Sequence, residues 1–252
     1  MRIHTTTRNP GTYIRLLCSV IASVLFVLFV PYLGATDESG YFPFIAVNVG
    51  ILYAITIGFL MMLAITRKQA LDAAISLELN KVRRLHHLAL NLHKVTPGTD
   101  AWYKATDKAI LAYLESFARR DFMEYEQGDK FARKMTYAIY ELPQSVSDYN
   151  GDLYGELLGA AASITESREN IRSTKDASIG YFQWAVTVGM TTVFATITAV
   201  ATPMDMIPRV LSGIGIFYYY LMLQLIFEYD QTNPKKRRYY IDSYLENARR
   251  MK

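Results

Sequence analysis

The sequence predicts an all-α, polytopic membrane protein with four transmembrane helices, arranged two and two around a helical cytosolic domain. Four runs of about twenty residues carry almost no charge, and each is long enough to cross a hydrocarbon core of about 30 Å. The polar remainder shows helical spacing of its apolar residues and no alternating strand pattern. A hydrophobic content of 51% excludes a disordered chain, and a single cysteine excludes a disulfide framework.

The apolar runs cover residues 16–33, 44–66, 184–202 and 210–227. The first follows three arginines and partly resembles a signal peptide, but its core is long and residues 33–35 make a poor cleavage site. We therefore expect it to be a transmembrane helix. The predicted divisions are an N-terminal arm with two transmembrane helices (1–66), a cytosolic helical domain (67–179), two further transmembrane helices (180–227) and a basic cytosolic tail (228–252).

The distribution of charge predicts the orientation in the membrane. Residues 1–15 carry three arginines and no acid, whereas the loop 35–42 carries two acids and no base. The positive-inside rule therefore places both termini and residues 67–179 in the cytoplasm. The basic stretch 235–238 is expected to act as a topology determinant and to bind lipid headgroups. Residues 67–179 hold 16 bases and 16 acids, a balance that argues against nucleic-acid binding.

The polar domain begins as an extension of the second transmembrane helix. No glycine or proline occurs between Gly58 and Pro97, so one helix is expected from Phe44 to about Lys94, a length of about 75 Å. Apolar residues recur along the extension at helical spacing and predict a buried stripe: Leu71, Ile75, Leu79, Val82, Leu85 and either Leu88 or Leu92. Further helices are expected over 100–127 and 129–142, and from 153 toward the third span, with Gly180 as the joint.

No pattern in the sequence indicates an enzyme or a cofactor site, since phosphate-binding loops, dinucleotide fingerprints and nucleophile elbows are all missing. Three histidines and a glutamate on one helix raise the question of a metal site. His86 lies seven residues before His93 and eight after Glu78, but ligand pairs on a helix need a spacing of three or four. No metal site is expected.

The second transmembrane helix carries two distinct faces. Gly50, Ala54 and Gly58 form a small-residue face that lets another helix approach closely. The opposite face is apolar except at its outer end and consists of Asn48, Leu52, Ile55, Phe59 and Met62. This second face either lines a pore, as a polar mouth leading into a hydrophobic constriction, or contacts lipid and neighbouring helices. No acidic or basic residue lies in the middle of a span, which counts against a proton-coupled transporter.

Two segments, one leaving the second span and one leading into the third, resemble the bacterial bestrophin-like membrane proteins. They are AITRKQALDAAISLELNKVRRLHHLALNL (64–92) and DLYGELLGAAASITESRENI (152–171), and the resemblance extends over roughly residues 44–230. It implies a homo-oligomeric, pentameric ion channel of the bacterial inner membrane that conducts anions such as chloride. It also implies that the second span lines a narrow apolar neck, in which Ile55 and Phe59 would form the constriction.

Two other functions remain open from the sequence. One is a non-conducting membrane scaffold or sensor that recruits a partner through its cytosolic helices. The other is a stator of the flagellar or energy-transducing type, which is less expected because its glycine-rich motifs are missing.

Overall fold

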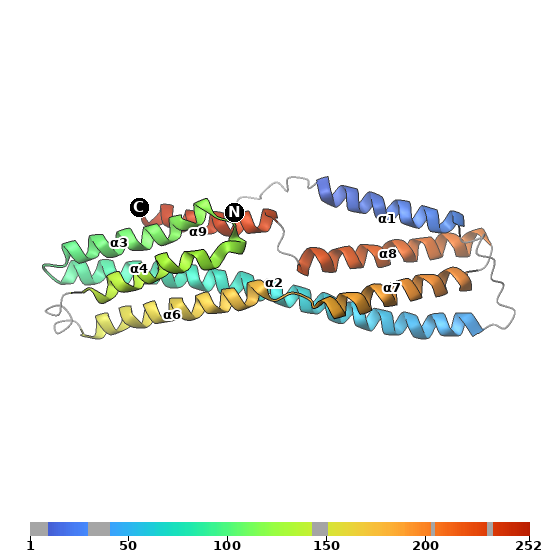
Figure 1. The fold of residues 1–252 in the computed structure, drawn as a ribbon, viewed down its shortest axis with the longest axis horizontal. Coiled ribbons are helices and arrows are strands. Elements are labelled where there is room, and N and C mark those ends of the chain that lie inside the picture. The colour runs from blue at the N-terminus through green and yellow to red at the C-terminus, as the bar shows by residue number, and fades with distance from the viewer. Residues whose placement is uncertain (1–9, 30–40, 143–150, 203–204, 231–233) are drawn as a thin grey trace. The chain divides into compact units, whose positions relative to one another are not determined.

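The computed structural model describes residues 10–29, 41–142, 151–202, 205–230 and 234–252 (Figure 1). Every secondary-structure element in these ranges is a helix, which confirms the all-α prediction for the described residues. The α-helices are α1 (Pro10–Phe29), α2 (Tyr41–Val95), α3 (Asp100–Glu115), α4 (Asp129–Tyr140), α6 (Gly151–Asp176), α7 (Tyr181–Ala201), α8 (Met206–Asp230) and α9 (Pro234–Met251). Two 3-10 helices, η2 (Ser116–Arg119) and η3 (Phe122–Gly128), follow α3.

The chain divides into two units. The described parts of Met1–Ile65 and Ile179–Gln231 form an apolar unit, and those of Thr66–Ser178 and Thr232–Lys252 form a polar unit. Helix α2 contributes to both. Its 55 residues form one uninterrupted helix of about 80 Å, as the lack of internal glycine and proline after Gly58 predicts.

Three stretches of the described residues are long and apolar enough to cross a membrane, within Val47–Val95, Gly151–Val200 and Met206–Asp230. They contain the fourth predicted span and most of the second and third. The first predicted span coincides with a shorter apolar stretch of α1, Leu17–Phe29, and its last residues, 30–33, lie outside the described ranges. The presence of four spans therefore stays a prediction.

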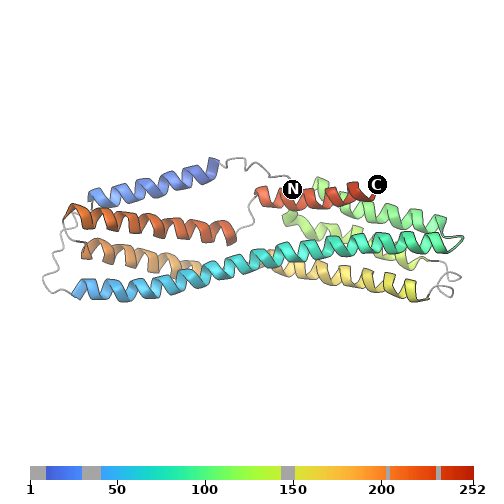
Figure 2. The same ribbon diagram turned by 180° about the vertical axis from the view of Figure 1, so that it is seen from behind.

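In the apolar unit, α8 lies between α1 and α7 (Figures 1 and 2). Polar side chains join α1 to α8: the Ser23 hydroxyl donates to the Gly213 carbonyl at 2.6 Å, and the Gln224 amide donates to the Ser19 hydroxyl at 3.2 Å. Such hydrogen bonds stabilise helix association where no water competes. The backbone of α8 lies close to α1 at Gly213, where a Cβ atom would lie 2.4 Å from the Val27 Cγ2 atom.

The close approach at Gly213 predicts a specific loss of packing in the Gly213→Ala variant. The added methyl group must displace Val27 and α1, so we expect a lower thermal midpoint in detergent, with a cost of about 1–3 kcal/mol. Gly215→Ala is the matched control, because a Cβ atom there meets its nearest neighbour at an ordinary 3.8 Å. Equal midpoints for the two variants, measured by circular dichroism, would contradict this account of the α1–α8 contact.

Helix α7 begins where α8 ends. Asp230, the last residue of α8, accepts a hydrogen bond from the Ile179 amide at 2.8 Å and one from the Trp184 indole at 3.3 Å. A carboxylate beside a helix N-terminus compensates both the unpaired amides and the helix dipole. The expected joint is present: α6 ends at Asp176, and Gly180 directly precedes α7.

The polar unit is a helical bundle built on the second half of α2. Every residue of the predicted stripe of α2 is buried, from Leu71 to Leu92. The partner helices bring mainly aromatic and branched side chains into the same core: Trp102, Ile110, Tyr113, Leu114, Phe117, Ile139, Leu157 and Ile164. Burial of this apolar surface is the main favourable contribution to folding of the unit.

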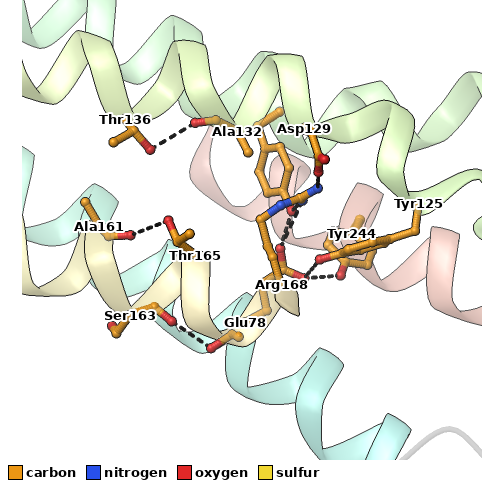
Figure 3. A network of polar contacts seen from close by, with 12 residues as sticks. Glu78, Tyr125, Asp129, Ala132, Thr136, Ala161, Ser163, Thr165, Arg168 and Tyr244 are labelled. Carbon is orange, nitrogen blue, oxygen red and sulfur yellow. Dashed lines mark hydrogen bonds and ion pairs between the residues drawn. The ribbon is translucent and has the colours of Figure 1, made fainter. Parts of the chain in front are cut away.

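A carboxylate on α2, that of Glu78, lies in the middle of this core with no exposed surface (Figure 3). One carboxylate oxygen of Glu78 accepts two hydrogen bonds, one from Tyr125 at 2.8 Å and one from Tyr244. The second carboxylate oxygen accepts a hydrogen bond from Tyr113. The Arg168 guanidinium lies 3.6 Å from Glu78. Glu78, Arg168 and these three tyrosines, which we call the Glu78 cluster, join α2 to α3, η3, α6 and α9.

The chemistry of the Glu78 cluster explains its composition. Burial raises the pKa of Tyr113, Tyr125 and Tyr244 well above 10.0, so at neutral pH each phenol keeps the proton that it donates. Arg168 donates to the Tyr113 hydroxyl and, at 2.5 Å, to Asp129. A buried charge is tolerated only when an opposite charge and several hydrogen bonds compensate its loss of hydration.

The segment after α3 differs from the prediction of one helix over 100–127. Helix α3 ends at Glu115, and the chain continues through η2 and η3 with an extended residue, Arg120, between them. The Asp121 carboxylate accepts the Met123 amide at 3.1 Å, a local hydrogen bond that competes with helix continuation. That bond, together with Arg237, holds the pKa of Asp121 below its ordinary value of 3.8.

The C-terminal residues also differ from the predicted basic tail, because α9 packs into the core of the polar unit. Tyr240 and Tyr244 are buried, and Tyr244 stacks on Phe117 with ring centroids 4.0 Å apart. Two bases of the stretch 235–238 bind acids of the same unit: Lys236 lies 3.1 Å from Asp72, and Arg237 lies 2.7 Å from Asp121. These two charges are therefore partly neutralised within the protein.

The Glu78 cluster predicts a cost for removing a single hydroxyl from α9. Tyr244→Phe keeps the ring but leaves a buried carboxylate oxygen with one donor fewer, so we expect a loss of about 1–3 kcal/mol and a lower thermal midpoint. Tyr239→Phe, an exposed neighbour, is the control. The same midpoint for Tyr244→Phe and wild type would show that the hydroxyl does not stabilise the unit.

Candidate pore-lining face of α2

The buried side of α2 in the apolar unit is fixed by aromatic packing. Tyr53 stacks on Phe194 of α7, with ring centroids 5.4 Å apart and planes at 6°, and meets Tyr219 of α8 edge-on at 5.2 Å. Phe194 and Tyr219 also meet edge-on, at 4.8 Å, so the three rings pack around a common centre. We call them the aromatic trio. Aromatic pairs in these geometries favour a defined relative orientation of their helices.

Further contacts of α2 near the aromatic trio agree with this orientation. Ile57, Leu60 and Ala64 follow Tyr53 at helical spacing, and all three are buried. The Thr191 hydroxyl of α7 lies 3.4 Å from the Tyr53 hydroxyl. The rotation of α2 about its own axis is therefore defined, and with it the face that is turned away from α7 and α8.

The face turned away from α7 and α8, which we call the outer face of α2, carries the five candidate pore-lining residues. The side chains of Leu52, Ile55, Phe59 and Met62 are 59%, 65%, 55% and 58% exposed, and Asn48 is also exposed. Each follows the previous one by three or four positions, so they form one stripe along the helix. The chain thus leaves a row of large apolar side chains uncovered opposite its aromatic trio.

The polar groups near this stripe bond to their own helix. The Asn48 side-chain amide donates to the Phe44 carbonyl at 2.9 Å, and the Thr56 hydroxyl donates to the Leu52 carbonyl at 2.9 Å. Donors that are satisfied in this way leave mainly apolar surface on the face. Asn48 keeps its amide oxygen as a polar group at the first turn of the stripe.

The predicted small-residue face has a mixed environment within the subunit. Gly50 lies against α7, where a Cβ atom would come within 3.0 Å of the Phe194 ring. Ala54 is exposed, and a Cβ atom at Gly58 would meet no other atom within 4 Å. Close packing therefore involves Gly50 inside the subunit, whereas Ala54 and Gly58 leave room for a helix from elsewhere.

The histidines of α2 have local partners. His86 lies 3.1 Å from Asp107, and His93 stacks on Tyr103 with ring centroids 4.7 Å apart. The described residues contain no group of three side chains suited to hold a metal ion.

Sequence reasoning did not identify the aromatic trio or the Glu78 cluster. Glu78 was considered only as a metal ligand. The available signal was a lone carboxylate inside the apolar stripe of α2, between Ile75 and Leu79. Its partners come from segments 35–166 residues away, which no local pattern reveals.

The helical bundle, the apolar spans and the uncovered face of α2 define an all-helical membrane protein. A family model described as "Bestrophin-like domain" matches residues 14–240. The chain therefore belongs to the bestrophin-like family, a family of membrane ion channels. A comparison with curated protein sequences gives no match.

Solved structures of bacterial bestrophin homologues share the fold. Two point variants of a bestrophin homologue from Klebsiella pneumoniae match with TM-scores of 0.71 and 0.70, at 14% and 15% identity. The matches cover 96% and 95% of this chain and 97% and 98% of those chains. A structure described as a membrane protein matches with a TM-score of 0.68 at 14% identity, over 95% of this chain and 97% of that one. At such identities the likeness concerns the fold.

Proposed function

We propose that this chain is the subunit of a homo-oligomeric anion channel whose pore is lined by the outer face of α2. In the proposed assembly, copies of α2 surround a central pore, and the side chains of Leu52, Ile55, Phe59 and Met62 face it. Asn48 lies at the outer mouth, and Ile55 and Phe59 form the constriction. Resemblance to bestrophins supports five subunits and chloride as a permeant ion.

The observation that carries the proposal is the uncovered apolar stripe on α2. An apolar face can be covered by lipid, by a second copy or by the narrow, weakly hydrated interior of a pore. Lipid alone would not explain why the helix that carries the stripe is also anchored at Glu78 and Tyr53, or why Ala54 and Gly58 leave space for an incoming helix. Membership of a channel family favours the pore.

A constriction of this kind controls conduction without any charge. Water leaves a narrow apolar segment readily, and an ion crosses it only when the segment widens or becomes wetted. The size of the side chains at the constriction therefore sets the barrier, which agrees with the lack of an acidic or basic residue in the middle of the second span.

The proposed orientation follows the charge distribution. Both termini and the polar unit lie on the cytoplasmic side of the bacterial inner membrane, in accord with the positive-inside rule. Since Lys236 and Arg237 bind acids of the polar unit, the exposed Arg238 is the proposed contact of this stretch with lipid headgroups.

Truncating the constriction should increase ion flux. We expect Ile55→Ala and Phe59→Ala each to raise the anion conductance of the purified protein in planar bilayers by about twofold or more, because a shorter side chain widens and wets the apolar segment. Leu211→Ala, a similarly exposed position on α8, serves as the control.

Unchanged conductance in both α2 variants would remove these residues from the pore. An absence of any flux through the wild-type protein, together with capture of a partner by its polar unit, would instead favour a non-conducting scaffold.

A further inference from the structure

The polar unit contains a cavity of about 370 Å³ that the channel proposal does not use. It lies among η3, α4 and α6, and Arg168 is one of the residues that line it. A volume of this size matches the lower range of sites that hold small organic ligands. The residues that matter for its chemistry are three arginines, three acids, two threonines and the exposed tyrosines Tyr137 and Tyr140.

Part of the charge around the cavity is already neutralised. Arg168 binds Asp129 at 2.5 Å and also faces Glu78, and Glu126 binds the Lys175 ammonium at 2.5 Å. Burial raises the pKa of Glu126, but Lys175 and then Arg172 outweigh it, so this pKa stays below its ordinary 4.5. Glu126 is therefore a carboxylate at neutral pH, and the ion pairs with Arg168 and Lys175 match the charges of the two acids.

Two other guanidinium groups remain available to a ligand. Arg133 on α4 and Arg172 on α6 are exposed, line the cavity and make no ion pair within 4 Å to another described residue. A guanidinium presents several N–H groups in one plane, a geometry that suits the paired oxygens of a carboxylate or a phosphate. Glu169 is the one acid of the lining that is likewise exposed and makes no ion pair within 4 Å to another described residue.

The threonines add acceptors rather than donors. The Thr136 hydroxyl donates to the Ala132 carbonyl at 3.1 Å, and the Thr165 hydroxyl donates to the Ala161 carbonyl at 3.5 Å. Each hydroxyl has thus used its only proton, and its oxygen can still accept a hydrogen bond. Figure 3 shows Thr136 on α4 and Thr165 on α6, to one side of Arg168.

We infer that this cavity binds a small organic oxyanion, a carboxylate or a phosphate monoester, which also carries hydroxyl or amino groups. Its oxyanion accepts from Arg133 and Arg172, and its donor groups bind the threonine oxygens and Glu169. The site does not depend on the pore assignment, because every residue involved belongs to the polar unit. It lies one side chain, that of Arg168, away from the carboxylate of Glu78 on α2 (Figure 3).

Calorimetric titration of the full-length protein in detergent tests this site. The probes are malate, a carboxylate with a hydroxyl group, and glycerol 3-phosphate, a phosphate monoester with two; succinate lacks the hydroxyl group of malate. We expect at least one probe to bind, and the probe that binds identifies the oxyanion. If malate is that probe, succinate should bind more weakly, because it cannot donate to the threonines.

Substitutions of the two lining arginines test the binding contacts, and one substitution outside the cavity serves as the control. Arg133→Gln and Arg172→Gln should each weaken binding about tenfold or more, the usual effect of losing a hydrogen bond between charged groups. Arg172→Lys, which keeps the charge but not the planar fork, should fall between wild type and Arg172→Gln. Arg249→Gln changes an exposed arginine on α9 outside the cavity and should have no effect.

Three results would overturn the inference. They are a wild-type protein that binds neither malate nor glycerol 3-phosphate, unchanged affinity in both Arg133→Gln and Arg172→Gln, or an equal loss in Arg249→Gln. Thermal midpoints of the variants should match that of wild type, since both side chains are exposed; this measurement separates lost binding from lost structure.

Discussion

A buried negative charge on the longest helix of the protein imposes the strongest constraint on the polar unit. Glu78 is completely inaccessible to water, and the loss of hydration of a carboxylate costs several kcal/mol unless the surrounding groups compensate it. Three phenols and a guanidinium, supplied by α3, η3, α6 and α9, surround it. Those segments must therefore meet at one level of α2, which sets the register of the whole bundle.

Helix α2 is held on one side in each unit. In the polar unit, the packed side of α2 carries Glu78 and the apolar stripe. In the apolar unit, the packed side carries Tyr53 of the aromatic trio. A helix that packs with one side only leaves the other available, and between Asn48 and Met62 the available side is apolar. The exposed face on which the proposed pore rests thus follows from the packing of the chain, because the same contacts that bury Tyr53 leave Ile55 and Phe59 exposed.

Local sequence patterns were sufficient to predict the long helix and its buried stripe. Helical periodicity and the lack of glycine and proline act within one element, so a reader of the sequence can recognise them. The break after Glu115 and the docking of α9 were not predictable in this way. Both depend on pairs that are far apart in the chain, such as Asp121 with Arg237 and Phe117 with Tyr244.

The candidate site was predictable only as a choice between two faces of the second span. The sequence separates Gly50, Ala54 and Gly58 from the stripe that contains Ile55 and Phe59. It does not show which residues of α7 and α8 meet α2. Phe194 and Tyr219 determine which face of α2 is buried, because they pack on Tyr53. This aromatic contact joins residues more than 130 positions apart in the chain. Side-chain packing of this kind has no signature in a single sequence.

The central claim, that the outer face of α2 lines a pore, is tested most directly by an electron cryomicroscopy map of the detergent-purified assembly. The account predicts a closed ring of subunits with an open central path, in which Ile55 and Phe59 of every copy point toward the axis. A ring whose α2 outer faces contact lipid, or a monomer with these side chains in the detergent belt, would contradict it.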